Sequence, residues 1–386
     1  MSAITKLVSD TKQANKTFYR TERLEAQTGN DSMKFNYNGI SQFSSIRNTA
    51  SSSTLDRLGF KSEGTNLNLR YQNNTIIADS LFGIKYNLSN FDLNKYGFNH
   101  VTSEKTIGLY QNNNASQLAI LTDGIYKNID FTVNTLDNQT SLLNTLSGLN
   151  LTYFKRAPSQ LFDQDAKSLN QRVAKNVSNS NKDFVTITYR VIAPPHSQLY
   201  VSIPNISWSD DNNHSLSITV NGVTRNQVTD NTFDFFDLGY FETESMVTIK
   251  LSFPGNKAIS FDNPSFYALD TQNYQIAMDT INERDSKVTT SNNKVFVDYS
   301  SKTNASLFFT IPYDKGWTAT INHKKVKIHR AQKGFMKVDV PSGKGKVVLT
   351  FIPYGLKTGL LISLLASIIF CCYAYFIRKI TVIQNS

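Results

Sequence analysis

The stretches LYVSIPNISW (Leu199–Trp208) and LFFTIPYDKGW (Leu307–Trp317) decide the fold of this chain of 386 residues. Each alternates apolar and polar residues into an Ile-Pro pair and then reaches a tryptophan, and the sequence holds 2 tryptophans in all. Alternation with a period of two is typical of a half-buried β-strand. The repetition predicts that one strand-based module occurs twice.

Further matches follow the two stretches in the same order. A turn at Asn221-Gly222 in the first copy corresponds to a turn at Asn322-His323 in the second. Asp237 in FFDL then corresponds to Asp339 in KVDV, and LSFP corresponds to LTFIP. An ordered series of matches indicates duplication better than any single match does. We therefore expect two related antiparallel β-sandwiches of the jelly-roll-like kind.

The rest of the chain divides by composition and patterning. The predicted fold class is mixed: an α+β N-terminal region, two tandem antiparallel β-sandwich modules and one C-terminal transmembrane helix. The predicted units are a mixed α/β region over 1–156, a helical connector over 157–182, a first sandwich over 183–270, a helical linker over 271–286, a second and basic sandwich over 287–355, the transmembrane helix over 356–379, and a tail over 380–386.

The segment TGLLISLLASIIFCCYAYFI, over 358–377, contains no charged residue and is long enough to cross a bilayer as a helix. The alternative is a buried core helix, but such helices rarely run this long without a charge. Arg378 and Lys379 after the segment outweigh Lys357 before it, which favours a cytoplasmic C-terminus. The N-terminal residues have no signal-peptide core, so we expect a piece of a larger bacterial membrane protein with its large N-terminal part extracytoplasmic, unless that part stays inside.

The net charge of +10 is concentrated in the second predicted sandwich. Nine basic and two acidic residues lie from Asp314 to Lys346, a net of +7. Beside a membrane helix, this charge favours an anionic lipid or envelope polymer as partner and not nucleic acid. Lysines kept for solubility explain the pattern equally well. The candidate contacts are Lys315, Lys324, Lys325, Lys327 and Arg330.

No arrangement of reactive side chains predicts catalysis, and no cofactor or metal site is expected, since the five histidines are scattered. Carbohydrate contact is the remaining chemistry. Tyr313, Asp314 and Trp317 combine aromatic rings with a carboxylate, a composition that suits sugar binding. Because Trp208 and Trp317 recur in both copies, the interpretation that each is a core residue is favoured over ligand contact.

The segment TIPYDKGWTATINHKKVKI (Thr310–Ile328) resembles the YfhO-like family of bacterial multi-pass membrane proteins. That family has an Ile-Pro-Tyr-x-x-Gly-Trp segment followed by a turn that is usually Asp-Gly, where this chain has Asn322-His323. The phrases FYRTE (Phe18–Glu22), NYNGISQFSS (Asn36–Ser45), DSLFGIKY (Asp79–Tyr86) and DNQTSLLNTLSGL (Asp137–Leu149) are also similar to it. The resemblance covers essentially the whole chain.

The resemblance implies a polytopic glycosyltransferase that uses lipid-linked sugars and acts on lipoteichoic acid or a related envelope polymer. The family's catalytic carboxylate is expected among earlier membrane helices, so no catalytic residue is carried onto this chain. Two hypotheses follow. The chain is an extracytoplasmic accessory region, non-catalytic by itself, whose partner is the multi-helix half of the transferase; or it is a self-contained, membrane-anchored glycan-binding or structural surface protein.

Overall fold

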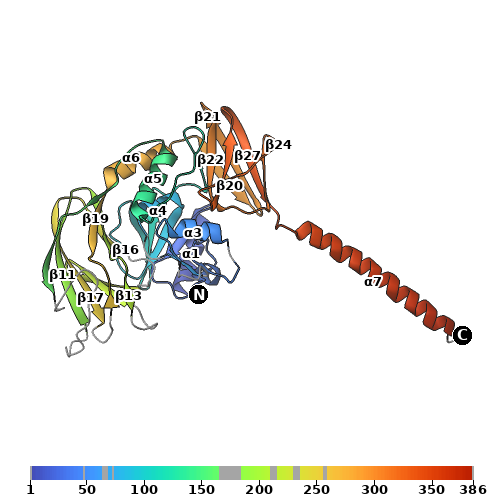
Figure 1. The fold of residues 1–386 in the computed structure, drawn as a ribbon, viewed down its shortest axis with the longest axis horizontal. Coiled ribbons are helices and arrows are strands. Elements are labelled where there is room, and N and C mark those ends of the chain that lie inside the picture. Colours follow the sequence, from blue (N-terminus) through green and yellow to red (C-terminus); the bar gives the residue numbers. More distant parts are fainter. Residues whose placement is uncertain are drawn as a thin grey trace.

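The structure, a computed structural model, describes residues 2–46, 48–62, 68–71, 74–164, 184–208, 215–228, 235–254 and 259–384. Figure 1 shows an N-terminal region between two strand-rich units, and one long helix that projects away from them. The mixed fold class expected from the sequence is confirmed. The order of the units along the molecule differs from their order along the chain, because the first sandwich and the second flank the N-terminal region.

The N-terminal region is built on a four-stranded sheet in which one pair is parallel. Its order is β1 (Arg20–Arg23), β5 (Ile84–Ser89), β7 (Ile107–Asn112) and β6 (Phe98–Glu104), with β1 parallel to β5. A smaller sheet contains β2 (Gln42–Phe43), β4 (Asn68–Arg70) and β3 (Lys61–Ser62). The helices are α1 (Ala3–Ala14), α2 (Asp31–Phe35), α3 (Thr49–Asp56), α4 (Ile76–Leu81) and α5 (Thr135–Ser147).

The first sandwich packs two antiparallel sheets face to face over one core. One sheet has the order β10 (Ser159–Gln164), β11 (Phe184–Ala193), β17 (Ser245–Pro254), β14 (Ser215–Val220) and β15 (Val223–Val228). The other has the order β16 (Phe235–Phe241), β12 (Ser197–Ser202), β19 (Ser265–Asp270) and β9 (Phe154–Arg156). A short pair, β13 (Ser207–Trp208) and β18 (Ile259–Ser260), lies beside them.

The second sandwich repeats the strand order of the larger sheet. Its larger sheet runs β20 (Ser286–Ser291), β21 (Lys294–Ser301), β27 (Gly343–Phe351), β23 (Trp317–Ile321) and β24 (Lys324–Val326). Its smaller sheet runs β25 (His329–Ala331), β26 (Phe335–Val340), β22 (Ala305–Pro312) and β8 (Ala119–Leu121). The two quoted stretches begin on β12 and β22, which make corresponding antiparallel pairs with β16 and β26. The smaller sheets differ at their edges, where the first has β9 and the second has β25 at the opposite side.

The turn asparagines of the two copies, Asn221 and Asn322, make equivalent hydrogen bonds. Asn221 Oδ1 accepts from the Thr248 amide at 3.0 Å, and Asn322 Oδ1 accepts from the Lys346 amide at 2.9 Å. Each asparagine begins a two-residue turn with positive φ at both positions, the geometry of a type I′ hairpin. The turn match made from the sequence is therefore structural, and it includes the bond that joins each turn to the neighbouring strand, β17 or β27.

His323 stands where the first copy has glycine, at a φ of 69°. A side chain at positive φ meets the backbone and destabilises the fold. We expect His323→Gly to raise the free energy of unfolding by about 1 kcal/mol, because glycine adopts this turn without strain. Urea unfolding of the full chain in nanodiscs measures the effect. Gly222→Ala in the first copy is the matched control and should change stability in the opposite direction; equal signs would contradict the assignment.

The tryptophan part of the sequence match is wrong. The position five residues before the turn asparagine is Trp317 in the second copy and Leu216 in the first, where Leu216 is fully buried. Trp208 lies instead on β13, paired with Ile259. The first copy has 13 residues from its tryptophan to the turn and the second has 5, so the two tryptophans lie on strands that do not correspond. The Trp208 side chain lies outside the described residues.

The expected helical connector over 157–182 is contradicted where the structure describes it. Residues 159–164 form β10, which pairs antiparallel with β11. The physical reason is that without β10 one edge of β11 would be unpaired, and the backbone groups on that edge gain hydrogen-bond partners from residues 159–164. The remainder of the connector, from 165 to 182, lies outside the described residues. In the linker over 271–286, α6 (Thr271–Asn282) forms as expected.

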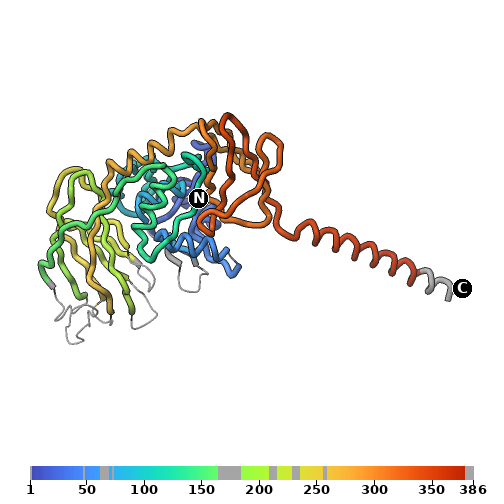
Figure 2. Tube along the Cα trace, turned by 45° about the horizontal axis from the view of Figure 1, so that its top comes forward, coloured from blue at the N-terminus to red at the C-terminus, as the bar shows by residue number. Residues whose placement is uncertain are grey.

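The N-terminal region is joined to both sandwiches by shared sheets and a shared core. It supplies β9 to the first sandwich and β8 to the second. Its central core also takes in Tyr200 from β12, Tyr274 from α6 and Phe308 from β22, each no more than 1% exposed. The Cα trace in Figure 2 shows the N-terminal region in contact with both units. These contacts hold the candidate sites described below in a fixed arrangement.

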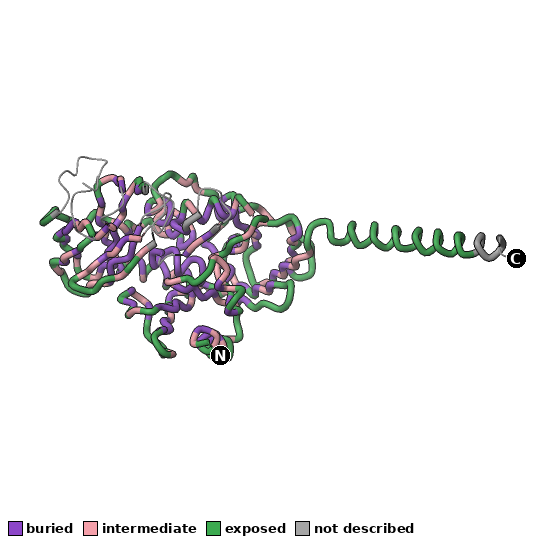
Figure 3. Tube along the Cα trace, turned by 90° about the horizontal axis from the view of Figure 1, so that it is seen from below, coloured by how far each residue is buried: buried purple, intermediate pink, exposed green. Residues whose placement is uncertain are grey.

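The last helix, α7 (Leu356–Gln384), makes no such contacts. Its segment Leu356–Arg378 is long and apolar enough to cross a membrane, and none of it is buried in the structure. Figure 3 shows it exposed along its described length, in contrast to the buried interior of the body. An apolar helix of this length in water would expose its whole surface, so a bilayer is the environment that suits it.

Candidate functional site

Four of the five predicted cations gather along one edge of the second sandwich. Lys324 and Lys325 lie on β24, the edge strand of the larger sheet, and Arg330 lies on β25, the edge strand of the smaller one. Lys327 lies in the crossing between these strands, and all four side chains are exposed. Lys315, also exposed, precedes β23, the neighbour of β24. We call these five residues the basic edge.

The basic edge lies close in the chain and in space to the membrane helix. Strand β27 ends at Phe351 and α7 begins at Leu356. The Lys315 ammonium lies 5.5 Å from the ring centroid of Tyr354, within that short connection. Cations placed beside a membrane helix meet the negative surface of the bilayer and its attached polymers. The structure therefore places Lys315 beside the connection that leads into α7.

The predicted glycan contacts Tyr313, Asp314 and Trp317 are neighbours, and each also has a partner within the fold. The Oδ1 atom of Asp314 accepts from the Gly316 amide at 2.7 Å and closes the turn. The Trp317 ring is half-buried against Phe351, at 5.0 Å between centroids. The Arg330 guanidinium lies 4.5 Å above the Tyr313 ring. Sugar contact at these residues stays a prediction.

The phrases that resemble the family meet at the junction between the N-terminal region and β22. Arg20, 9% exposed, donates to the carbonyl of Phe82 at 2.6 Å and to that of Thr310 at 2.7 Å. The Asn48 amide, from the loop before α3, donates to the Tyr313 carbonyl at 2.6 Å. A small pocket of about 140 Å³ opens here between these segments. Residues of the phrases FYRTE, DSLFGIKY and TIPYDKGW thus join the N-terminal region to the second sandwich.

A cluster of charged side chains that the sequence did not reveal lies inside the N-terminal region. Lys95 and Asp79 form an ion pair in which neither side chain is exposed. Lys95 also donates to the Tyr71 hydroxyl at 3.3 Å. Glu22, 1% exposed, accepts from the Ser41 amide at 3.0 Å and its hydroxyl at 2.9 Å. No local pattern marks these residues, because they come from segments separated along the chain.

Asp237 of the first sandwich faces this cluster, and burial governs the pKa values of its carboxyls. Burial raises the pKa of Asp79 and of Asp237 to about 6 and that of Glu22 to about 7, although nearby donors and Lys95 oppose the shifts of the aspartates. Asp237 Oδ2 accepts from Gln198 at 2.7 Å. The corresponding Asp339 accepts from Ser306 at 2.6 Å but is half-buried beside Lys337.

The two matched aspartates should respond to pH in opposite directions. The pKa of Asp237 is about 6 in the fold against 3.8 ordinarily, so its charge destabilises the fold above pH 6 and the penalty disappears as pH falls towards 4. The free energy of unfolding of Asp237→Asn, relative to that of wild type, should therefore be about 2 kcal/mol higher at pH 7 than at pH 4. Denaturant unfolding at both pH values measures this.

Asp339→Asn is the control for that experiment. Burial alone would raise the pKa of Asp339, but hydrogen bonds from Ser306 and Lys337 lower it below its ordinary value. Its charge therefore stabilises the fold above the unfolded pKa, and this stabilisation is lost on acidification. The variant should be less stable than wild type at pH 7, with a smaller difference at low pH. Parallel pH profiles for the two variants would contradict the assignment.

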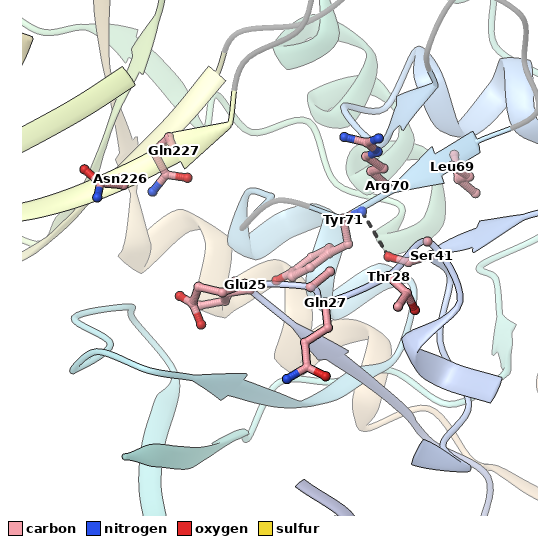
Figure 4. A pocket seen from close by; sticks show the side chains of 12 residues that line it. Glu25, Gln27, Thr28, Ser41, Leu69, Arg70, Tyr71, Asn226 and Gln227 are labelled. Carbon is pink, nitrogen blue, oxygen red and sulfur yellow. Dashed lines mark hydrogen bonds between the residues drawn. The ribbon is translucent and has the colours of Figure 1, made fainter. Parts of the chain in front are cut away.

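A larger pocket, of about 440 Å³, lies between the N-terminal region and the β14–β15 hairpin. One wall is the segment that follows β1 and includes Glu25 and Gln27, and the opposite rim is Asn226 and Gln227 of β15 (Figure 4). Tyr71 also lines the pocket, and its amide donates to the Ser41 hydroxyl at 3.0 Å. Sequence reasoning missed this pocket because its two sides are some two hundred residues apart in the chain.

Comparisons with known proteins agree with the resemblance noted from the sequence. Residues 1–363 match the family described as "Bacterial membrane protein YfhO". A Bacillus subtilis (strain 168) protein named "Uncharacterized protein YfhO" is 25% identical over 135 residues. The match covers 33% of this chain and 16% of that protein, so the chain corresponds to a small part of that relative's length.

The similarities to solved structures are weak. A cycloisomaltooligosaccharide glucanotransferase from Paenibacillus sp. is 7% identical, with 55% of this chain and 50% of that one covered, at a TM-score of 0.19. A conserved protein of unknown function from Pseudomonas aeruginosa PAO1 is 9% identical, with 51% and 84% covered, at a TM-score of 0.14. Neither similarity carries a functional argument, but the match to the family spans nearly the whole chain. This chain belongs to the YfhO family of bacterial membrane proteins.

Proposed function

We propose that this chain is the extracytoplasmic accessory region of a YfhO-type glycosyltransferase of the bacterial envelope. By itself it is non-catalytic, and it holds an anionic acceptor, lipoteichoic acid or a related polymer, near the membrane. The large N-terminal part lies outside and the C-terminus lies in the cytoplasm. The catalytic step belongs to a multi-helix half with which this region assembles. Lipid-linked sugar is the donor.

The observation that carries the proposal is the basic edge beside the membrane helix. Lys324, Lys325, Lys327 and Arg330 are exposed at the β24–β25 edge of the last sandwich, Lys315 is exposed before β23, and a short connection joins that sandwich to α7. A polyanion anchored in the same membrane would meet this edge at high local concentration. Lysines on an edge strand also prevent pairing with other chains, a role that predicts no polymer binding.

The test compares polymer binding by two variants with the same net charge. Purified full-length chain in neutral nanodiscs is titrated with lipoteichoic acid over a salt series. One variant replaces the five residues of the basic edge with glutamine. The control replaces five exposed lysines elsewhere, Lys12, Lys16, Lys105, Lys127 and Lys250. The basic-edge variant should bind at least about tenfold more weakly at low salt, and the gap should narrow as salt screens the charges.

Equal binding by the two variants would exclude the basic edge as the contact. Vesicles of phosphatidylglycerol provide a further arm, because binding to them alone would assign the edge to lipid. The alternative function is a self-contained glycan-binding surface protein. An adjacent upstream reading frame for a multi-helix protein that copurifies with this chain supports the accessory role, and its absence supports the self-contained protein.

A further inference from the structure

The small pocket at the junction between the N-terminal region and the second sandwich is lined by a buried arginine. The pocket encloses about 140 Å³, and Arg20 of β1, 9% exposed, lies in its lining. Gln42 and Pro312 are the exposed residues of that lining, so they mark where the pocket opens. Four of the phrases that resemble the family meet here. They supply Arg20, Ile40, Gln42, Phe82, Thr310 and Pro312.

Three of the five N–H donors of Arg20 are engaged by the fold. The Nη1 atom donates to the Phe82 carbonyl and to the Thr310 hydroxyl, and Nη2 donates to the Thr310 carbonyl. The donors without a partner among the described residues are Nε–H and the second N–H of Nη2. These two lie side by side on one edge of the guanidinium, the edge that binds two oxygens of a carboxylate or phosphate at once.

The positive charge of Arg20 also lacks an anion. Among the described residues, its hydrogen-bond partners are carbonyls and a hydroxyl, and no carboxylate pairs with it. Burial lowers the pKa of Arg20 to about 10, although Glu22 on the same strand opposes the shift. Glu22 accepts instead from the Ile40 and Ser41 amides. A buried cation without a counterion is unfavourable, so an oxyanion that enters the pocket would be stabilised.

The other lining groups narrow the class of anion. Buried apolar side chains, among them Leu69 and Phe335, form walls that suit C–H groups. The Ser51 hydroxyl donates to the Asn48 carbonyl at 2.9 Å, so its oxygen is left to accept from a ligand. The Gln42 amide adds a donor and an acceptor at the opening. A phosphate group on a short carbon chain that carries hydroxyl groups matches this lining.

The pocket opens beside the basic edge. Pro312, at the opening, is followed by Tyr313, and the Arg330 guanidinium lies 4.5 Å from the Tyr313 ring centroid. A polyanion held along the basic edge would therefore bring its charged groups to the pocket at high local concentration. Lipoteichoic acid, the acceptor in the proposed function, carries its negative charge on phosphodiesters. The position thus favours phosphate over carboxylate as the occupant.

We propose that this pocket binds one phosphate group of a glycerol phosphate unit, with two phosphate oxygens accepting from Nε and Nη2 of Arg20 and a glycerol hydroxyl donating to Ser51 Oγ. The inference deepens the proposed function, on which it rests for the source of the unit. The basic edge attracts the polymer through charge, and the pocket recognises one of its units through paired hydrogen bonds and shape.

The experiment titrates full-length chain in neutral nanodiscs with α-glycerophosphate and with glycerol, and follows binding by saturation-transfer NMR. The phosphate ester should bind saturably, and glycerol should bind at least about tenfold more weakly because it has no anion for Arg20. Binding should persist in about 0.5 M sodium chloride, since a partly buried pair is screened less than exposed lysines are. No saturable binding, or binding that disappears at that salt concentration, would overturn the inference.

Variants of the lining locate the site. Arg20→Lys keeps the charge but lacks the side-on pair of donors, and should weaken α-glycerophosphate at least about tenfold. Arg57→Lys is the matched control, since Arg57 is exposed and lies outside the lining, and it should bind as wild type does. Gln42→Ala, at the exposed opening, should weaken binding at least about threefold without loss of fold. Unchanged affinity in Gln42→Ala, or in an Arg20→Lys variant that unfolds like wild type, would contradict the assignment.

Competition separates the source of the unit from the proposed function. Lipoteichoic acid that displaces α-glycerophosphate supports the polymer as source, whereas displacement by phosphatidylglycerol vesicles alone would overturn it in favour of a lipid headgroup. α-Glycerophosphate binding that survives in the basic-edge variant, together with weakened lipoteichoic acid binding, supports both proposals. Lipoteichoic acid binding without α-glycerophosphate binding leaves the proposed function standing and removes the phosphate pocket, and the reverse result removes the polymer role alone.

Discussion

Lys95→Met should destabilise the fold by about 3–5 kcal/mol. The substitution leaves Asp79 inside the protein without its cation. Neither side chain of the pair is exposed, and Asp79 Oδ1 has no hydrogen-bond partner among the described residues. The desolvation penalty of an unpaired buried carboxylate accounts for the loss. Denaturant unfolding of full-length chain in nanodiscs measures it.

Two further variants check that the buried charge is the cause. Lys95→Met combined with Asp79→Leu should recover most of the lost stability, because no charge is then left inside. Lys346→Met breaks the exposed pair with Asp298, whose side chains are 52% and 57% exposed, and should change stability by less than about 1 kcal/mol. A double variant as unstable as Lys95→Met would show that packing, and not charge, causes the loss.

Gly316→Ala should destabilise the second sandwich by about 3 kcal/mol. A Cβ atom at Gly316 would fall on the carbonyl oxygen of Ile352, and it would lie 2.9 Å from the Phe351 ring. The Ile352 amide donates to the Gly316 carbonyl at 3.0 Å, so the clash would separate the Gly-Trp turn from the connection to α7. Hydrogen exchange should increase at the end of β27 more than in the first sandwich.

The control for this substitution is Gly359→Ala, in the membrane helix, where a Cβ atom meets nothing within 4 Å. That variant should unfold as wild type does. Uniform loss of protection across both sandwiches in Gly316→Ala would contradict the local explanation. The expected result gives the Gly-Trp phrase a structural reason, because only glycine lets the turn approach the segment that leads into the membrane.

The sequence predicted those parts of the fold that depend on periodicity and local turns. Alternating residues on β12 and β22 indicated the two sandwiches. The turns at Asn221 and Asn322 showed how the sequences of the two copies align. The apolar run that begins at Leu356 indicated the membrane helix. Each of these signals lies within one short segment, where side-chain pattern and backbone conformation are directly linked.

Other features depend on partners that a single segment does not reveal. Residues 159–164 form a strand because β11 would otherwise leave one edge of its sheet unpaired. Trp208 and Trp317 are not equivalent because the first copy has more residues between its tryptophan and its turn. The sequence predicted that these basic residues lie close together along the chain. The positions of β24 and β25 as edge strands decided that Lys324, Lys325, Lys327 and Arg330 lie at one edge of the sandwich. The pocket near Glu25 had no sequence signal of its own.

By itself, then, the sequence determined the duplicated sandwich, the membrane segment, the position of the excess charge and the resemblance to the family. Only the tertiary structure decided that Lys95 meets Asp79, that Asp237 lies buried near them, and that Glu25 faces the β15 rim across a pocket. The physical reason is that burial and pairing of polar groups arise from contacts between distant segments. No local sequence pattern shows which of these polar groups is buried from solvent.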